Sequence, residues 1–113
     1  MHEMALCESI LQVIEDQAAA QNFSAVKSVH LEIGPLAGVE RDALEFGFDV
    51  VMRGTLADGA TLRISEPPAT AWCLPCAETV AIKERFDACP HCGSRQLQVT
   101  GGEELRIKDM EVM

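Results

Sequence analysis

Apolar residues recur along two stretches of the chain at the spacing of one face of a helix. In residues 3–20 they follow an i, i+3, i+4, i+7, i+11 pattern through Cys7, Ile10, Leu11, Ile14 and Ala18. In residues 40–53 the shared face carries Leu44, Phe48, Val51 and Met52. Glu40 and Asp42 open the second stretch, where the helix dipole favours negative charge. We therefore expect two helices, the first beginning almost at the amino terminus.

Two other stretches alternate between apolar and polar residues, which is typical of half-buried strands. Residues 26–33 place Val29, Leu31 and Ile33 on one side and Ser28, His30 and Glu32 on the other, before Gly34-Pro35 ends the run. Residues 61–66 place Leu62 and Ile64 inward, and Pro67-Pro68 then begins a linker.

The end of the chain predicts a third strand. Leu105 and Ile107 alternate in phase, whereas Met110 and Val112 fall out of phase with them. A one-residue bulge near Lys108-Asp109 would restore a common face, and the alternative is a strand buried on both sides. Because a two-stranded sheet is marginal alone, we expect this strand to complete the sheet. The predicted fold is α+β, with two helices on a three-stranded sheet.

Four cysteines form two C-x-x-C motifs in the segment between the linker and the last strand. Cys73 and Cys76 make the first motif, and Cys89 and Cys92 make the second. Two such motifs on β-hairpins can close a tetrahedral site of four thiolates, which is typical of a structural zinc ion. We expect residues 69–100 to be a zinc-ribbon insertion into a domain built from residues 1–68 and 101–113. Cys7 lies on the apolar helix face, so we interpret it as a core residue.

Other chemistries of the four cysteines are less favoured. A rubredoxin-like iron site uses similar motifs, and colour would distinguish it from zinc. A thioredoxin-like dithiol needs one motif at a helix start in a βαβ context, which neither motif has. A nucleic-acid-binding zinc ribbon needs excess Lys and Arg, yet the whole chain has 9 basic and 18 acidic residues and a net charge of −9. We therefore expect no nucleic-acid partner.

The amino terminus offers a second metal site of different chemistry. A helix that begins at residue 3 or 4 leaves its first backbone N–H groups without intrahelical partners. Together with the His2 imidazole and the Met1 amine, these nitrogens suit square-planar Ni(II) or Cu(II). The deprotonated His2 nitrogen can form chelate rings with the Met1 amine, the Glu3 nitrogen and its own imidazole, but all three rings cannot close on one flat site. If the imidazole and the Glu3 nitrogen take the cis positions, the trans ligand must come from elsewhere. The side chains that we consider for it are Glu3, His30, Glu40 and His91.

Several segments together resemble the HypA/HybF family of nickel-insertion chaperones for [NiFe] hydrogenase. They are Met1-His2-Glu3, Leu31-Glu32-Ile33-Gly34, Gly38-Val39-Glu40, the paired cysteine motifs with Cys89-Pro90-x-Cys92-Gly93-Ser94, and Gly102-x-Glu104-Leu105-x-Ile107 with Met110-Glu111. The resemblance covers essentially the whole chain. It implies nickel binding at His2 and Glu3, and structural zinc at Cys73, Cys76, Cys89 and Cys92. It ties the Glu40 carboxylate to nickel in part of the family.

The resemblance also implies function and partners. We expect a nickel metallochaperone without catalysis, acting with a HypB-type GTPase to deliver Ni(II) to the [NiFe] hydrogenase large subunit; some family members also serve urease. The alternative is a zinc-stabilised protein-interaction module with an inert amino terminus. No nucleophile elbow or phosphate-binding loop indicates an enzyme. Without an apolar stretch of about 20 residues or a signal peptide, we expect a cytoplasmic protein with no membrane partner. Exchange of the insert between chains would give a homodimer, which the sequence leaves open.

Overall fold

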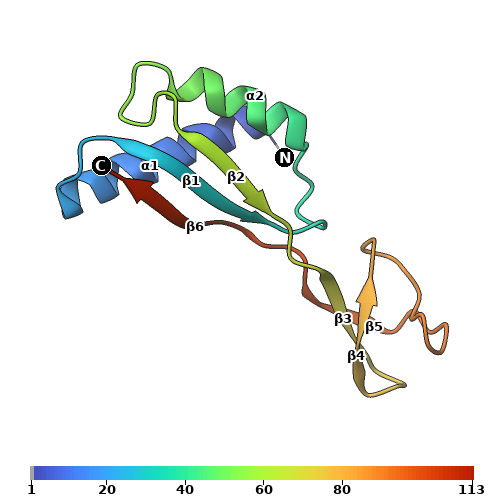
Figure 1. Ribbon diagram of the computed structural model, residues 1–113. Helices are drawn as coiled ribbons and strands as arrows, with labels where there is room; N and C mark the ends of the chain where they lie inside the picture. The colour runs from blue at the N-terminus through green and yellow to red at the C-terminus, as the bar shows by residue number, and fades with distance from the viewer. Residues whose placement is uncertain (1) are drawn as a thin grey trace. The chain divides into compact units, whose positions relative to one another are not determined.

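The computed structural model describes residues 2–113, which form two helices and six strands (Figure 1). In chain order these are α1 (Glu3–Gln21), β1 (Val26–Ile33), α2 (Arg41–Met52), β2 (Thr61–Ser65), β3 (Ala69–Cys73), β4 (Glu78–Ile82), β5 (Leu97–Gly101) and β6 (Leu105–Val112). The strands form two separate three-stranded sheets, with the orders β2-β1-β6 and β4-β3-β5. The predicted α+β fold is confirmed, including the C-terminal strand as the third member of the first sheet.

The two helices begin and end where the sequence chemistry places them. His2 is the N-cap of α1, and at the other end Asn22 adopts a left-handed conformation and donates its N–H to the Ala18 carbonyl. Glu40 is the N-cap residue of α2, and it makes no capping hydrogen bond with its own side chain. The two helices pack against each other, and Gly47 lies so close to α1 that an added Cβ would be 3.3 Å from the Cys7 sulfur.

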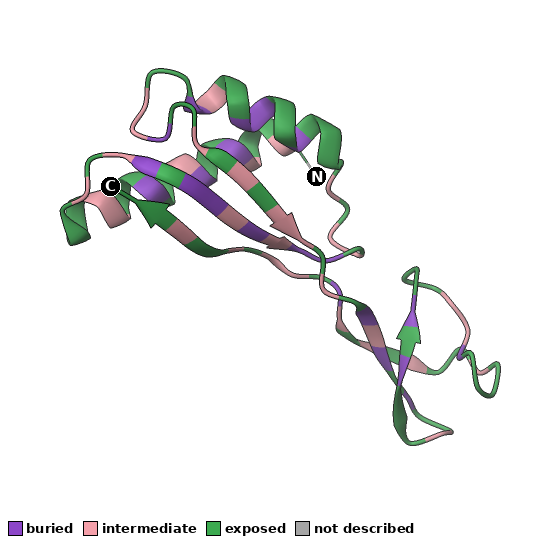
Figure 2. Cartoon of the chain, in the orientation of Figure 1, coloured by how far each residue is buried: buried purple, intermediate pink, exposed green. Residues whose placement is uncertain are grey.

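The first compact unit comprises Met1–Leu31, Val39–Ile64 and Ile107–Met113. Both helices lie on one face of its sheet (Figure 1), and the buried side chains of α1, α2 and β1 form the core between them (Figure 2). Cys7 is fully buried there, as expected. Ser28 is also buried, at 6% exposure, although the alternation placed it outward. It lies on β1, the central strand, which is flanked on both edges.

The burial of β6 decides between the two interpretations of the last strand. Leu105, Ile107 and Met110 are half-buried, while Lys108 and Asp109 are both exposed. No residue of the strand is fully buried, so burial on both faces is wrong. The inward phase changes at Lys108-Asp109, the position at which one of the two alternatives placed a bulge.

The second compact unit comprises Glu32–Gly38 and Ser65–Arg106. β3 is its central strand and pairs antiparallel with β4 and with β5, in a register that places Cys73 opposite Glu78 and Leu97. Its core is small and contains two cysteines: Ala69, Ala71, Cys73, Val80, Ile82 and Cys89. The unit is longer than the expected insertion of residues 69–100, because it also includes Glu32–Gly38, residues 65–68 and residues 101–106.

Backbone contacts hold Glu32–Gly38 in the second unit. Gly34 donates its N–H to the Glu104 carbonyl at 2.8 Å, and Leu36 donates to the Gly102 carbonyl at 2.7 Å. The approach is so close that a Cβ on Gly34 would be 2.1 Å from the Gly102 oxygen. Gly34 therefore has to be glycine for reasons of space, whereas Gly102 has a φ of +102° and has to be glycine for its conformation.

Candidate metal centres

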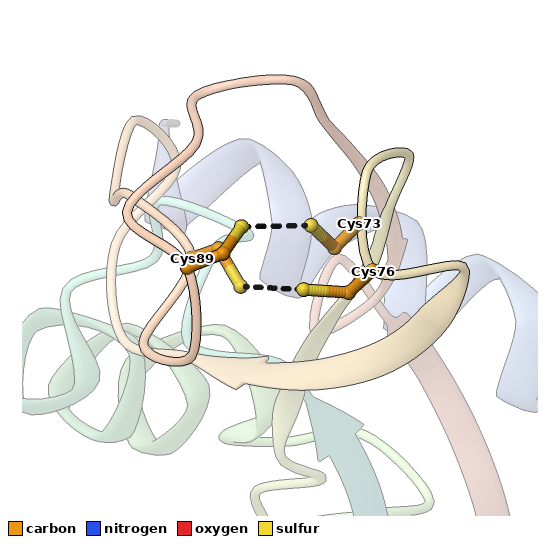
Figure 3. A group of neighbouring side chains, drawn as sticks. Cys73, Cys76 and Cys89 are labelled. Atoms are coloured by element: carbon orange, nitrogen blue, oxygen red, sulfur yellow. Dashed lines mark hydrogen bonds between the residues drawn. The ribbon is translucent and has the colours of Figure 1, made fainter.

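The four cysteines of the two C-x-x-C motifs lie together in the second unit. Their sulfur atoms are all within 4.8 Å of one another, with 3.7 Å from Cys73 to Cys92 and 4.0 Å from Cys76 to Cys89. Figure 3 shows the side chains of Cys73, Cys76 and Cys89 turned toward one another. Zn–S bonds of about 2.3 Å in a tetrahedron separate the sulfur atoms by about 3.8 Å. The donor set and its spacing thus fit a zinc ion bound by four thiolates.

The two C-x-x-C motifs have the same local backbone geometry. Ala77 and Gly93 directly follow the second cysteine of their motifs, and both have positive φ, 53° and 76°. Ala77 donates its N–H to the Cys73 carbonyl at 2.8 Å, and Gly93 donates to the Cys89 carbonyl at 2.9 Å. The two motifs are therefore structurally equivalent turns, although only the second has the glycine that such a turn favours.

The surroundings of the four thiols favour ionisation of Cys89 and oppose ionisation of Cys73 and Cys76. Burial opposes ionisation of Cys89, but hydrogen bonds from the backbone amides of Cys92 and His91 lower the pKa of its thiol to about 6. Burial raises the pKa of Cys73, and hydrogen bonds shared with the thiols of Cys92 and Cys73 raise the pKa of Cys76. Four adjacent thiolates repel one another, so the fully ionised set requires a cation at its centre.

The amino-terminal residues His2 and Glu3 lie at the start of α1, in the first unit. His2 is exposed and has an extended backbone, and its Nδ1 atom accepts a hydrogen bond from the Ala5 N–H at 3.3 Å. The His2 carbonyl accepts the N–H of Leu6 at 3.1 Å, which is the first backbone bond of the helix. Met1, whose amine we considered as a nitrogen donor, lies outside the described residues. The capping role of His2 was not expected, although a polar residue directly before an apolar-periodic segment signals it.

The Glu3 carboxylate connects the starts of the two helices. Its Oε2 atom accepts the backbone N–H of Glu40 at 3.2 Å. This hydrogen bond and one from the backbone of Glu3 itself lower the pKa of the Glu3 carboxyl group. The structure thus brings Glu3 and the backbone of Glu40 together, beside the residue that caps α1.

The other two histidines that we considered as nickel ligands have partners of their own. His30 Nδ1 lies 3.3 Å from Asp109 Oδ2 in the first unit. His91 Nδ1 lies 2.7 Å from Glu78 Oε1 in the second unit, where the β3–β4 register brings Glu78 beside the first cysteine motif. Among residues 2–113, the four cysteines are the one group of three or more His, Cys, Asp or Glu side chains that could hold a metal ion.

No helix within residues 2–113 is both long enough and apolar enough to cross a membrane. The fold and the cysteine site together define a small α+β protein with a zinc-ribbon-like metal centre.

Comparison with known proteins places this class more exactly in one family. A family model described as "Hydrogenase/urease nickel incorporation, metallochaperone, hypA" matches residues 1–112. The hydrogenase maturation factor HypA of Alkalilimnicola ehrlichii is 65% identical over 112 residues, which are 99% of each chain. That of Azotobacter chroococcum mcd 1 is 60% identical over 112 residues, also 99% of each chain. The chain therefore belongs to the HypA family of nickel-incorporation metallochaperones, as the sequence resemblance implied.

Solved structures agree on the fold. The solution structure of the Ni metallochaperone HypA from Helicobacter pylori matches with a TM-score of 0.72 and 21% identity, over 100% of this chain and 98% of that chain.

Proposed function

We propose that the chain binds Ni(II) at its amino terminus, through His2 and the backbone of Glu3, and delivers it for the maturation of [NiFe] hydrogenase. It holds nickel as cargo and does no catalysis. Four thiolates, from Cys73, Cys76, Cys89 and Cys92, bind a structural Zn(II). Residues 1–68 and 101–113 act as the nickel-binding domain, and residues 69–100 act as the zinc ribbon. The proposed partners are a HypB-type GTPase and the hydrogenase large subunit, in the cytoplasm.

One observation carries the nickel proposal. The His2 ring is exposed and turned so that Nδ1 faces the open start of α1. There the backbone N–H groups of the first turn have no intrahelical acceptors, so the nitrogens that a nickel chelate needs lie next to the ring. A site made mostly of backbone nitrogens on an exposed chain end binds a borderline-soft ion and still lets it leave, which suits a delivery protein.

The test is nickel titration of the purified, untagged and zinc-loaded protein, with metal content measured by mass spectrometry. We expect one zinc per chain and one nickel site, and we expect His2→Ala to abolish that nickel site without changing zinc content or folding. His30→Ala is the matched control, because it removes another histidine of the same unit and should leave nickel binding intact. If His2→Ala binds nickel as well as the wild type, the amino-terminal site is wrong, and if neither protein binds nickel, the chain is instead a zinc-stabilised interaction module.

A further inference from the structure

The hydrogen bond at the start of α1 fixes the protonation pattern of the His2 ring. Nδ1 accepts the Ala5 N–H at 3.3 Å, so this atom presents a lone pair and the ring proton of the neutral imidazole is on Nε2. The backbone of His2 is extended, with φ −89° and ψ 102°, which turns the ring back over the first turn of the helix. The helix start therefore selects one tautomer and one orientation of the ring.

A nickel chelate that includes the His2 backbone nitrogen needs this same lone pair. The backbone nitrogen, Cα, Cβ, Cγ, Nδ1 and the metal close a six-membered ring. The Nε2 atom is on the far side of the imidazole, and its lone pair points away from the backbone. One lone pair cannot accept the Ala5 hydrogen bond and bind nickel at the same time.

We infer that nickel binding exchanges the helix cap for a metal bond: the Ala5 amide positions His2 Nδ1 in the free protein, and nickel displaces it. The inference rests on the proposed nickel function of His2. Before nickel binds, the Ala5 amide holds the neutral imidazole in the tautomer whose Nδ1 atom can bind a metal. When nickel binds, the Ala5 amide loses this acceptor and is exposed to solvent. On release, the cap forms again and competes with nickel for Nδ1.

The size of the competition follows from the strength of a helix cap. Losing an N-cap costs about 1 kcal/mol, which is about a fivefold change in a dissociation constant. Competition between the Ala5 amide and nickel for Nδ1 therefore raises the dissociation constant of nickel only about fivefold, and it acts in the direction of release. The Glu3 carboxylate binds the Glu40 N–H independently of the cap, so α1 stays attached to α2 while its first turn opens.

Two variants separate capping from chelation at the same position. His2→Asn keeps a good N-cap and has no imidazole, and His2→Ala has neither. We expect the Ala5 amide to be protected without metal in the wild type and in His2→Asn, and unprotected in His2→Ala. Adding nickel should change this protection in the wild type alone.

The experiment is amide–water exchange by NMR on the full-length, ¹⁵N-labelled and zinc-loaded protein, with and without one equivalent of Ni(II). We expect nickel to raise the exchange rate of the wild-type Ala5 amide severalfold, to the rate in His2→Ala, while the Ile10 amide is unchanged. Nickel bound with unchanged Ala5 exchange would overturn the cap exchange and leave the nickel function standing. The same holds for equal increases at Ala5 and Ile10, which would indicate general unfolding of the helix. If the wild type binds no nickel, the proposed function fails and the inference fails with it.

Discussion

Removing zinc should unfold the second unit and leave the helices of the first unit folded. The four buried residues of its core other than cysteine are Ala69, Ala71, Val80 and Ile82. Their side chains contain nine carbon atoms, and at about 0.8 kcal/mol per buried carbon they contribute about 7 kcal/mol. A structural zinc site contributes about 10–16 kcal/mol of apparent binding free energy. The metal therefore outweighs the buried core, and the unit should not stay folded without it.

Hydrogen exchange followed by mass spectrometry can measure this loss directly. We expect peptides from β3, β4 and β5 of the chelator-treated protein to exchange at the rate of an unfolded chain, while α1 and α2 keep their protection. Peptides from Glu32–Gly38 should lose protection as well, because their hydrogen bonds go to the second unit. Cys73→Ser should reproduce the effect, and Cys7→Ser, at a cysteine outside the site, should not. Protection of β3 and β4 that survives metal removal would refute the reasoning.

Three further changes should have smaller effects. Gly34→Ala should destabilise the second unit by about 2–3 kcal/mol, because the new Cβ would clash with backbone atoms of Gly102. Gly38→Ala should cost only ~1 kcal/mol, because there the new side chain has space and only the left-handed conformation is unfavourable. Chemical denaturation of the zinc-loaded protein would measure both changes in the free energy of unfolding. Gly93→Ala should lower the free energy of unfolding by about 1 kcal/mol, because alanine is unfavourable in the left-handed conformation. Ala77→Gly should change it little, because glycine relieves the left-handed conformation of residue 77 but also raises the entropy of the unfolded chain. Equal costs of the two variants would contradict the equivalence of the two turns. The pKa of the Glu3 carboxyl group is lowered in the folded state, so the carboxylate stabilises the fold at pH values above the ordinary pKa of glutamate, and this contribution is lost as the pH falls through the lowered pKa. The difference in free energy of unfolding between the wild type and Glu3→Ala should therefore disappear in acid. A difference that grows in acid would contradict this prediction.

The periodicity of the sequence predicted most of the fold. The two helices begin and end within one or two residues of the expected positions, and the strand at residues 26–33 was predicted at its observed limits. The C-x-x-C spacing predicted which four sulfur atoms come together. These features depend on local patterns or on fixed metal geometry, which a sequence displays directly.

Contacts between distant residues were not predictable. Nothing around Gly34 indicates that its neighbour is Gly102, because the contact depends on the register between two distant segments. Phe86 is 83% exposed, although it is one of the few large apolar residues of the zinc unit. Ser28 is buried on β1, although the alternation of the sequence placed it outward.

X-ray absorption at the nickel and zinc edges, on the protein loaded with one equivalent of each metal, tests most directly whether the two metals occupy two different sites. We expect four sulfur ligands at about 2.3 Å around zinc, and only nitrogen and oxygen ligands around nickel, including an imidazole. Sulfur ligands around nickel would contradict it, because nickel would then occupy the cysteine site instead of the amino terminus.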